Sequence, residues 1–73
     1  MKKVCICRAQ INGERFRLIA VVKEGLSVPE GYIIFVGRKR YTLYMYQTID
    51  TALGAWNELV SRNVVNLLAR GLV

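Results

Sequence analysis

The dipeptide Asn12-Gly13 constrains this chain more than any other feature, because it lies between two strand-like runs, 2–11 and 14–24. Asn-Gly is the preferred pair for a two-residue type I′ hairpin loop, in which both central residues take positive φ. A loop of this length pairs Ile11 with Glu14, so that paired residue numbers sum to 25. The dipeptide therefore predicts which side chains share each face of the hairpin.

The two predicted faces differ in chemistry. One face pairs Lys3 with Val22, Cys5 with Ala20, Cys7 with Leu18, and Ala9 with Phe16. The other pairs Val4 with Val21, Ile6 with Ile19, Arg8 with Arg17, and Gln10 with Arg15. We interpret the first face as core. Since like charges directly opposed on a sheet are unfavourable, we expect the second face to have a partner.

The rest of the chain predicts a second hairpin and a helix. Two glycines and the only proline indicate a loop over 25–31. Alternating β-branched and aromatic residues predict strands over 32–36 and 41–47, with a turn at 37–40 that places Val36 opposite Tyr41. Apolar residues then recur with helical spacing, so we expect a helix capped by Thr48 or Asp50. Asn63 is expected to interrupt it, leaving 65–70 as a second short piece.

These elements define an α+β fold in a single domain, 1–73. We expect a four-stranded antiparallel β-meander of two hairpins, followed by one C-terminal α-helix packed on one sheet face. The expected core combines Cys5, Cys7, Phe16, Leu18, Ile34, Leu43 and Met45 with Leu53, Trp56, Leu59 and Val60 of the helix. This strand and helix order is similar to one repeat of the Whirly-type fold, and the resemblance implies binding of single-stranded DNA.

The charge favours a polyanionic partner, since eleven Lys and Arg against five Asp and Glu give a net charge of +6. We expect a small nucleic-acid-binding module that slightly prefers single strands to duplex. Arginines neutralise phosphates and aromatic rings stack on bases. The candidate phosphate contacts are Arg8, Arg15, Arg17, Arg38, Lys39 and Arg40. The candidate stacking residues are Phe35, Tyr44 and Tyr46, unless the faces of the second hairpin are inverted.

An alternative interpretation is a protein-interaction or assembly module, a regulator or inhibitor, that uses the apolar part of the open sheet face. A chain this small buries only about 60% of its unfolded surface, which favours oligomerisation. We therefore expect a homodimer whose seam is formed by Val4, Ile6, Ile19, Val21 and Ile33. The response of binding to salt discriminates the two interpretations, because phosphate contacts are strongly salt-dependent.

Catalysis is not expected. The chain has no histidine, and its five carboxylates are scattered without paired spacing. Cys5 and Cys7 lie two residues apart on a strand, about 7 Å, too far for an unstrained disulfide. We expect no metal, no cofactor and no enzymatic activity. Apolar runs are too short to cross a bilayer and charges precede any signal-like core, so we expect no membrane association and a cytoplasmic location.

Overall fold

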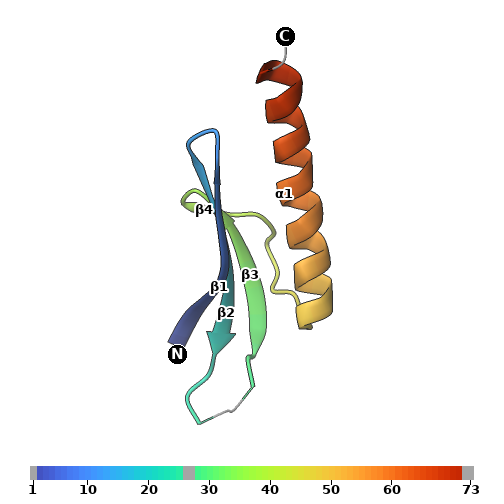
Figure 1. Ribbon diagram of the computed structural model, residues 1–73. Helices are drawn as coiled ribbons and strands as arrows, with labels where there is room; N and C mark the ends of the chain where they lie inside the picture. Colours follow the sequence, from blue (N-terminus) through green and yellow to red (C-terminus); the bar gives the residue numbers. More distant parts are fainter. Residues whose placement is uncertain (1, 26–27, 72–73) are drawn as a thin grey trace.

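The computed structural model describes residues 2–25 and 28–71 and consists of two layers, a sheet and a helix (Figure 1). The elements are β1 (Lys2–Ile11), β2 (Glu14–Val22), β3 (Gly31–Val36), β4 (Lys39–Arg40) and α1 (Ile49–Gly71). The strands are antiparallel and lie in the order β1-β2-β3-β4. The helix contacts β1, β2 and β3 on one face of the sheet. The expected α+β fold, an antiparallel meander followed by one helix, is confirmed.

The first hairpin turns at Asn12-Gly13 as predicted. Both residues have positive φ, 52° and 82°, which is the requirement of a type I′ loop. Ile11 pairs with Glu14, and the predicted register continues down to Cys7 and Leu18. The turn chemistry therefore fixes the faces of the distal half of the hairpin.

Below Cys7 the predicted register is wrong, because a β-bulge lies between Cys5 and Cys7. The extra residue shifts the pairing by one, so Cys5 lies opposite Ile19 and Val4 lies opposite Ala20. A one-residue shift moves each side chain to the other face. Cys5 therefore leaves the core face, and Val4 joins it.

The second hairpin turns one residue earlier than expected. Val36 pairs with Lys39, which leaves Gly37-Arg38 as a two-residue loop. Gly37 has a φ of 64°, and glycine with positive φ at the first loop position is typical of a type II′ turn. The strand after this turn, β4, has only two residues.

The expected strand over 41–47 is also wrong, because the chain leaves the sheet after Tyr41. It returns at Tyr46, which exchanges backbone hydrogen bonds of 2.9 and 2.8 Å with Tyr32. Between these points Leu43 is 96% exposed, so its assignment to the core is wrong. Met45 lies against Gly31 rather than in the core cluster, so that assignment is wrong too.

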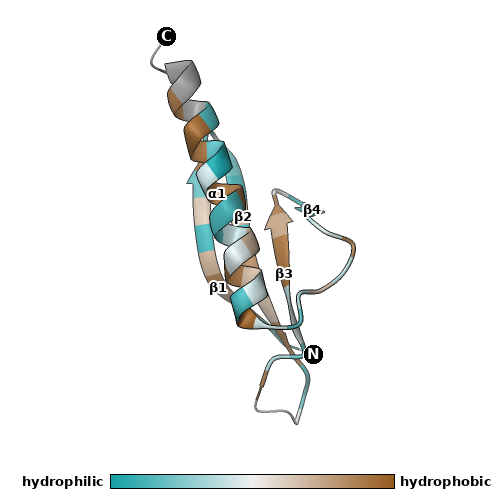
Figure 2. Ribbon diagram, turned by 90° about the vertical axis from the view of Figure 1, so that its right-hand side faces the viewer, coloured by the Kyte–Doolittle hydropathy of each residue, from teal (hydrophilic) through white to brown (hydrophobic). Residues whose placement is uncertain are grey.

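The core forms between the helix and the sheet face that carries Phe16, Leu18 and Ile34, the most deeply buried side chains. Figure 2 shows the helix lying over this face. The other members of the buried cluster are Ile11, Ala20, Tyr32, Ala52, Trp56 and Leu59. Most of the predicted core, including the helix stripe, is thus confirmed.

Thr48, one of the two expected caps, precedes the first helical residue, Ile49, and caps the helix. The Thr51 backbone N–H donates to Thr48 Oγ1 at 3.2 Å, and Asp50 lies in the first turn, where its charge complements the helix dipole. The expected interruption at Asn63 is wrong: its side-chain amide donates to the Leu59 carbonyl at 2.8 Å within one continuous helix. Among the described residues, no helix has the length and apolarity needed to cross a membrane.

Candidate nucleic-acid interface

One row of side chains crosses all four strands on the face away from the helix. Arg8 of β1 pairs with Arg17 of β2, Arg17 pairs with Phe35 of β3, and Phe35 pairs with Arg40 of β4. Directly paired residues of antiparallel strands share a face. Their neighbours Leu18 and Ile34 are buried under the helix, so the row projects to the opposite side. We call this surface the arginine face.

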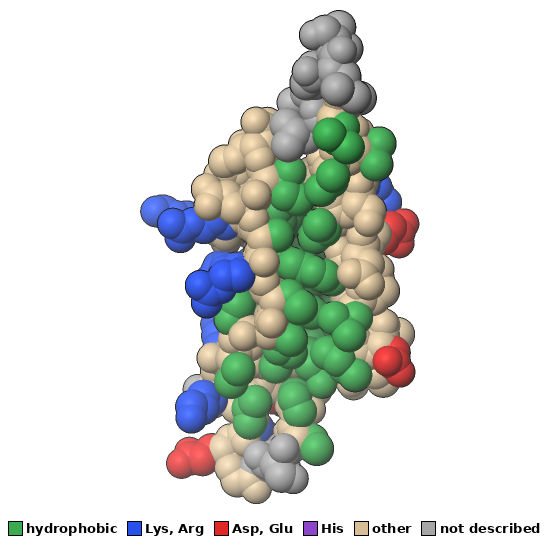
Figure 3. Space-filling view, in the orientation of Figure 1, with side chains coloured by type: hydrophobic (Ala, Val, Ile, Leu, Met, Phe, Trp, Pro, Cys, Tyr) green, Lys and Arg blue, Asp and Glu red, His purple; other side chains and the backbone are tan. Residues whose placement is uncertain are grey.

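Charge gathers on this side of the molecule. In Figure 3 most visible Lys and Arg side chains project from the side of the sheet that lies away from α1. Arg8, Arg15, Arg17 and Arg40 are all exposed. The only ion pair among the described residues is Glu58–Arg62 on the helix. The arginines of the face therefore have no carboxylate partner in the described part of the chain, and they remain available for an anion.

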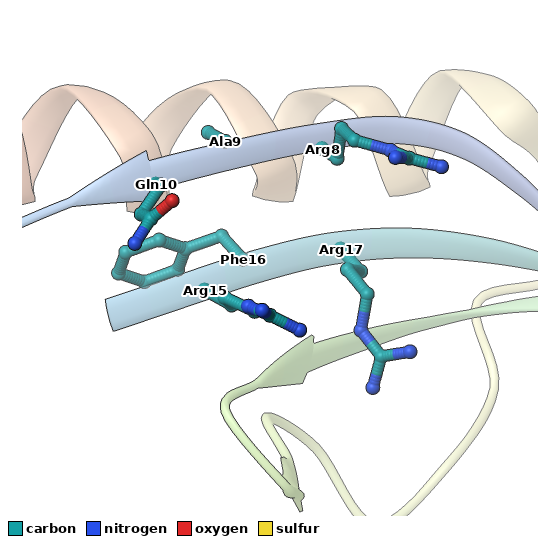
Figure 4. Close-up of a pocket in the computed structure, with 6 residues that line it drawn as sticks. All are labelled: Arg8, Ala9, Gln10, Arg15, Phe16 and Arg17. Carbon is teal, nitrogen blue, oxygen red and sulfur yellow. The ribbon is translucent and has the colours of Figure 1, made fainter. Parts of the chain in front are cut away.

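Arg17 is held at the centre of the row by an aromatic ring. Its guanidinium carbon lies 5.2 Å from the centroid of the Phe35 ring, within the range of a cation–π interaction. Figure 4 shows the Arg17 side chain extending from β2 toward β3. Phe35 is partly exposed. The pair thus presents a flat cation beside an aromatic ring, and both can stack on a base.

Two shallow depressions flank Arg15 and Arg17. The first, of about 520 Å³, is lined by Arg8, Ala9, Gln10, Arg15, Phe16 and Arg17 (Figure 4). The second, of about 550 Å³, is lined by Gly13, Arg15, Arg17, Gly37 and Arg38. The Gly37 backbone N–H donates to the Arg15 carbonyl at 2.7 Å, which holds the two hairpin ends together. Arg15 and Arg17 line both depressions and are therefore the centre of the candidate site.

The structure separates Lys39 from the arginines. Lys39 pairs with Val36, whose side chain packs against the core, so Lys39 lies on the helix side of the sheet. Arg38 lines the second depression, and Arg40 lies in the central row. The basic run 38–40 is thus divided between the two faces, as alternation along a strand requires.

The tyrosines are separated from the arginine face as well. Tyr46 lies opposite Tyr32 and packs against the core, so grouping it with Phe35 on one face is wrong. Burial raises the pKa of the Tyr46 phenol, and the nearby Tyr44, Tyr41 and Glu58 raise it further. Tyr44 is exposed and packs edge-on against Tyr46, with ring centroids 5.8 Å apart. Of the three candidate stacking residues, Phe35 alone is paired with arginines across the sheet.

The apolar residues expected on the open face are mostly covered. Ile19, Val21 and Ile33 are buried, whereas Val4 and Ile6 are exposed. Met45 contributes to this cover, since its side chain lies 3.0 Å from the position of a Cβ on Gly31, which pairs with Val21. The expected dimer seam therefore cannot use all five residues.

Sequence reasoning missed Gly13 and Gly37 as parts of the site. Gly13 was predicted only as a turn residue, and the position of the second turn was displaced by one. The signal for Gly37 was its place directly before the basic run, because a glycine there can take the positive φ that a tight loop needs.

The described residues hold no group of three or more His, Cys, Asp or Glu that could bind a metal ion. Cys5 and Cys7 are free thiols, and the Cys5 thiol donates weakly to the Cys7 carbonyl at 3.4 Å. The bulge places them on opposite faces of β1, since Cys5 pairs with Ile19 and Cys7 with Leu18.

No family matches this chain, and neither a curated protein nor a solved structure shows significant similarity to it.

Proposed function

We propose that this chain is a small, non-catalytic nucleic-acid-binding module that uses the arginine face. The observation that carries the proposal is the row Arg8–Arg17–Phe35–Arg40, which places three unpaired cations and one aromatic ring in register across the sheet. The net charge of +6 supports attraction of a polyanion over longer distances.

The roles of the residues follow from their positions. Arg8, Arg15, Arg38 and Arg40 contact phosphates from around the two depressions. Arg17 and Phe35 form a stacking platform, because a guanidinium and a phenyl ring both offer a flat surface to a base. Stacking needs an unpaired base, so a single strand is the preferred ligand.

The salt dependence of binding tests this proposal. Labelled single-stranded DNA, duplex DNA and RNA are titrated by fluorescence anisotropy at low and near-physiological salt. We expect saturable binding that is tightest for a single strand and weakens steeply with salt. Absence of binding at low salt, or binding indifferent to salt, would refute the proposal.

A matched pair of double variants locates the interface. Arg15→Ala with Arg17→Ala removes the two central cations. Lys39→Ala with Arg62→Ala removes two cations that lie elsewhere, and both variants fall from +6 to +4. Counterion release of about 0.7 per phosphate contact predicts that loss of Arg15 alone weakens binding about 8-fold at about 50 mM salt. Loss of the Arg17 stacking surface adds to this, and we expect both effects for the first variant only. Equal losses would show that net charge, rather than this face, governs binding.

A further inference from the structure

A strip of apolar side chains runs along the side of the molecule where β1 forms the edge of the sheet. On β1, the residues that face the helix layer are Lys2, Val4, Cys7, Ala9 and Ile11. Ile11 is buried in the core, whereas the other four are not buried. Val4 is 45% exposed, and Ile6 at the bulge is 44% exposed. Figure 3 shows hydrophobic side chains filling the surface between this edge and the helix. The sheet side of the strip is therefore incompletely covered.

The helix contributes a second line of apolar side chains to the same surface. Leu53, Val60 and Val64 are spaced i, i+7 and i+11, so they align along one side of α1 beside the core stripe. In Figure 1, α1 runs upward with the sheet on its left, and β1 lies on the side of the sheet nearest the viewer. Because the helix is right-handed, this line of residues lies on the viewer's side of the core stripe. The line therefore lies on the same side of the molecule as β1. Val64 is 38% exposed. We define the β1-side strip as Val4, Cys7, Ala9, Leu53, Val60 and Val64.

Apart from Lys2 at one end of β1, the strip is the uncharged side of a strongly cationic molecule. The arginines project from the far face of the sheet, and the Glu58–Arg62 pair lies on the other side of the helix from Val60 and Val64. Two chains of charge +6 repel each other, so they can approach closely only where neither presents cations. The β1-side strip meets that condition except at Lys2, which lies at its end. An apolar strip matches a copy of itself without needing a complementary surface.

We propose that a second copy of this chain docks on the β1-side strip about a two-fold axis, with the two β1 strands antiparallel. The outer edge of β1 has no strand beside it among the described residues, so its backbone groups are free to pair. The two-fold axis is perpendicular to the sheet. The strips of the two copies therefore face each other, and both helices lie on the same side of the joined sheet. The proposal does not depend on nucleic-acid binding.

Charge selects the register of the two strands. Opposed residues must share a face, and the two registers that pair most of β1 place Val4 opposite either Cys7 or Ala9 of the second copy. The first register places Lys3 opposite Arg8, which is unfavourable. The second places Lys3 opposite Gln10. We therefore assign the register in which Val4 lies opposite the second copy's Ala9.

The size of the strip indicates a dimer that dissociates on dilution. Ten residues of β1 extend about 33 Å, and with a layer spacing of about 10 Å the strip covers about 330 Å² on each copy. Specific interfaces usually bury about 800 Å² per partner, so this one lies at the weak end. The oligomeric state must therefore be followed over a range of concentrations.

Sedimentation equilibrium from low to high micromolar concentration tests the proposal, with neighbouring residues as matched variants. Val64→Glu places a carboxylate in the interface, whereas Val65→Glu places it 100° away around the helix, where Val65 is 62% exposed. We expect Val64→Glu to raise the dimer dissociation constant at least about tenfold and Val65→Glu to change it by less than about twofold. Circular dichroism establishes that both variants fold. A monomeric wild-type chain, or equal effects of the two variants, would overturn the proposal.

A disulfide tests the register. In a Cys5→Ala, Cys7→Ala background, Val4→Cys with Ala9→Cys brings two thiols to paired positions, where Cα atoms about 5 Å apart permit an unstrained bond. Mild oxidation should give a covalent dimer in high yield. A dimer that forms by sedimentation but does not cross-link would refute this register.

Discussion

The division of the basic run 38–40 between the two faces makes a sharp prediction about two adjacent residues. Arg40 lies in the central row beside Phe35, and Lys39 lies on the helix side beside Val36. Both are exposed, and replacing either with alanine lowers the net charge from +6 to +5. The two variants therefore have the same net charge, and they differ in the face that loses its cation.

The magnitude follows from counterion release. For single strands, each phosphate contact contributes about 0.7 to the slope of log K against log salt. Loss of one contact should therefore weaken binding about 8-fold at about 50 mM salt and about 4-fold at about 150 mM. Arg40→Ala should show both the loss and a slope that is shallower by about 0.7, whereas Lys39→Ala should show neither.

Anisotropy titration of a labelled single strand at four or more salt concentrations measures both quantities. Arg62→Ala serves as a third variant, since it also removes one charge but from the outer side of the helix. If Arg40→Ala and Lys39→Ala give the same slope, the arginine face is not the binding surface. If Lys39→Ala has the larger effect, the ligand contacts the helix side, and the assignment of faces to function is reversed.

Three further predictions concern stability, measured by urea unfolding with the fluorescence of the single tryptophan as the signal. Thr48→Ala should lower the free energy of unfolding by about 1 kcal/mol, because the first turn of the helix loses its cap. Gly31→Ala should lower the free energy of unfolding by about 1 kcal/mol or more, since a Cβ there would lie 3.0 Å from Met45. Gly54→Ala should raise the free energy of unfolding by a similar amount, because nothing lies within 4 Å of a Cβ at that position of the helix. Changes of the same sign in the two variants would contradict this packing. The pKa of Tyr46 is raised above 10.0 in the folded chain, so the neutral phenol stabilises the fold below pH 10 and this contribution is lost as the pH rises further. Tyr46→Phe removes the ionisable group, and it should therefore flatten the fall in the free energy of unfolding at alkaline pH.

The distal half of the first hairpin was predictable because a single dipeptide determines it. Asn12 and Gly13 can take positive φ at low cost, and the register from Ile11 to Cys7 follows by alternation. The pairing of Arg8 with Arg17, the base of the candidate site, was therefore visible in the sequence. The bulge was not, since no turn residue marks Ile6, and its position depends on how the edge strand packs.

The second hairpin was less predictable because both of its expected faces were apolar. Leu43 and Tyr44 fit a strand by alternation, yet the chain leaves the sheet between Tyr41 and Tyr46. Hydrophobic periodicity indicates a strand only where one face is buried and the other is not. Tyr46 was consequently assigned to the wrong side, and Phe35 was placed correctly because it belongs to a strand with two neighbours.

The alternation in β2 has a consequence for how this chain can change over evolutionary time. The strand carries the core on one side through Phe16 and Leu18, and the candidate site on the other through Arg15 and Arg17. Replacing either arginine alters the exterior alone, so ligand preference can drift without loss of the fold. Inserting or deleting one residue between Gly13 and Leu18 would exchange interior and exterior at once. We expect relatives of this chain to vary freely in the identity of the exposed β2 residues and to keep the length of that segment constant.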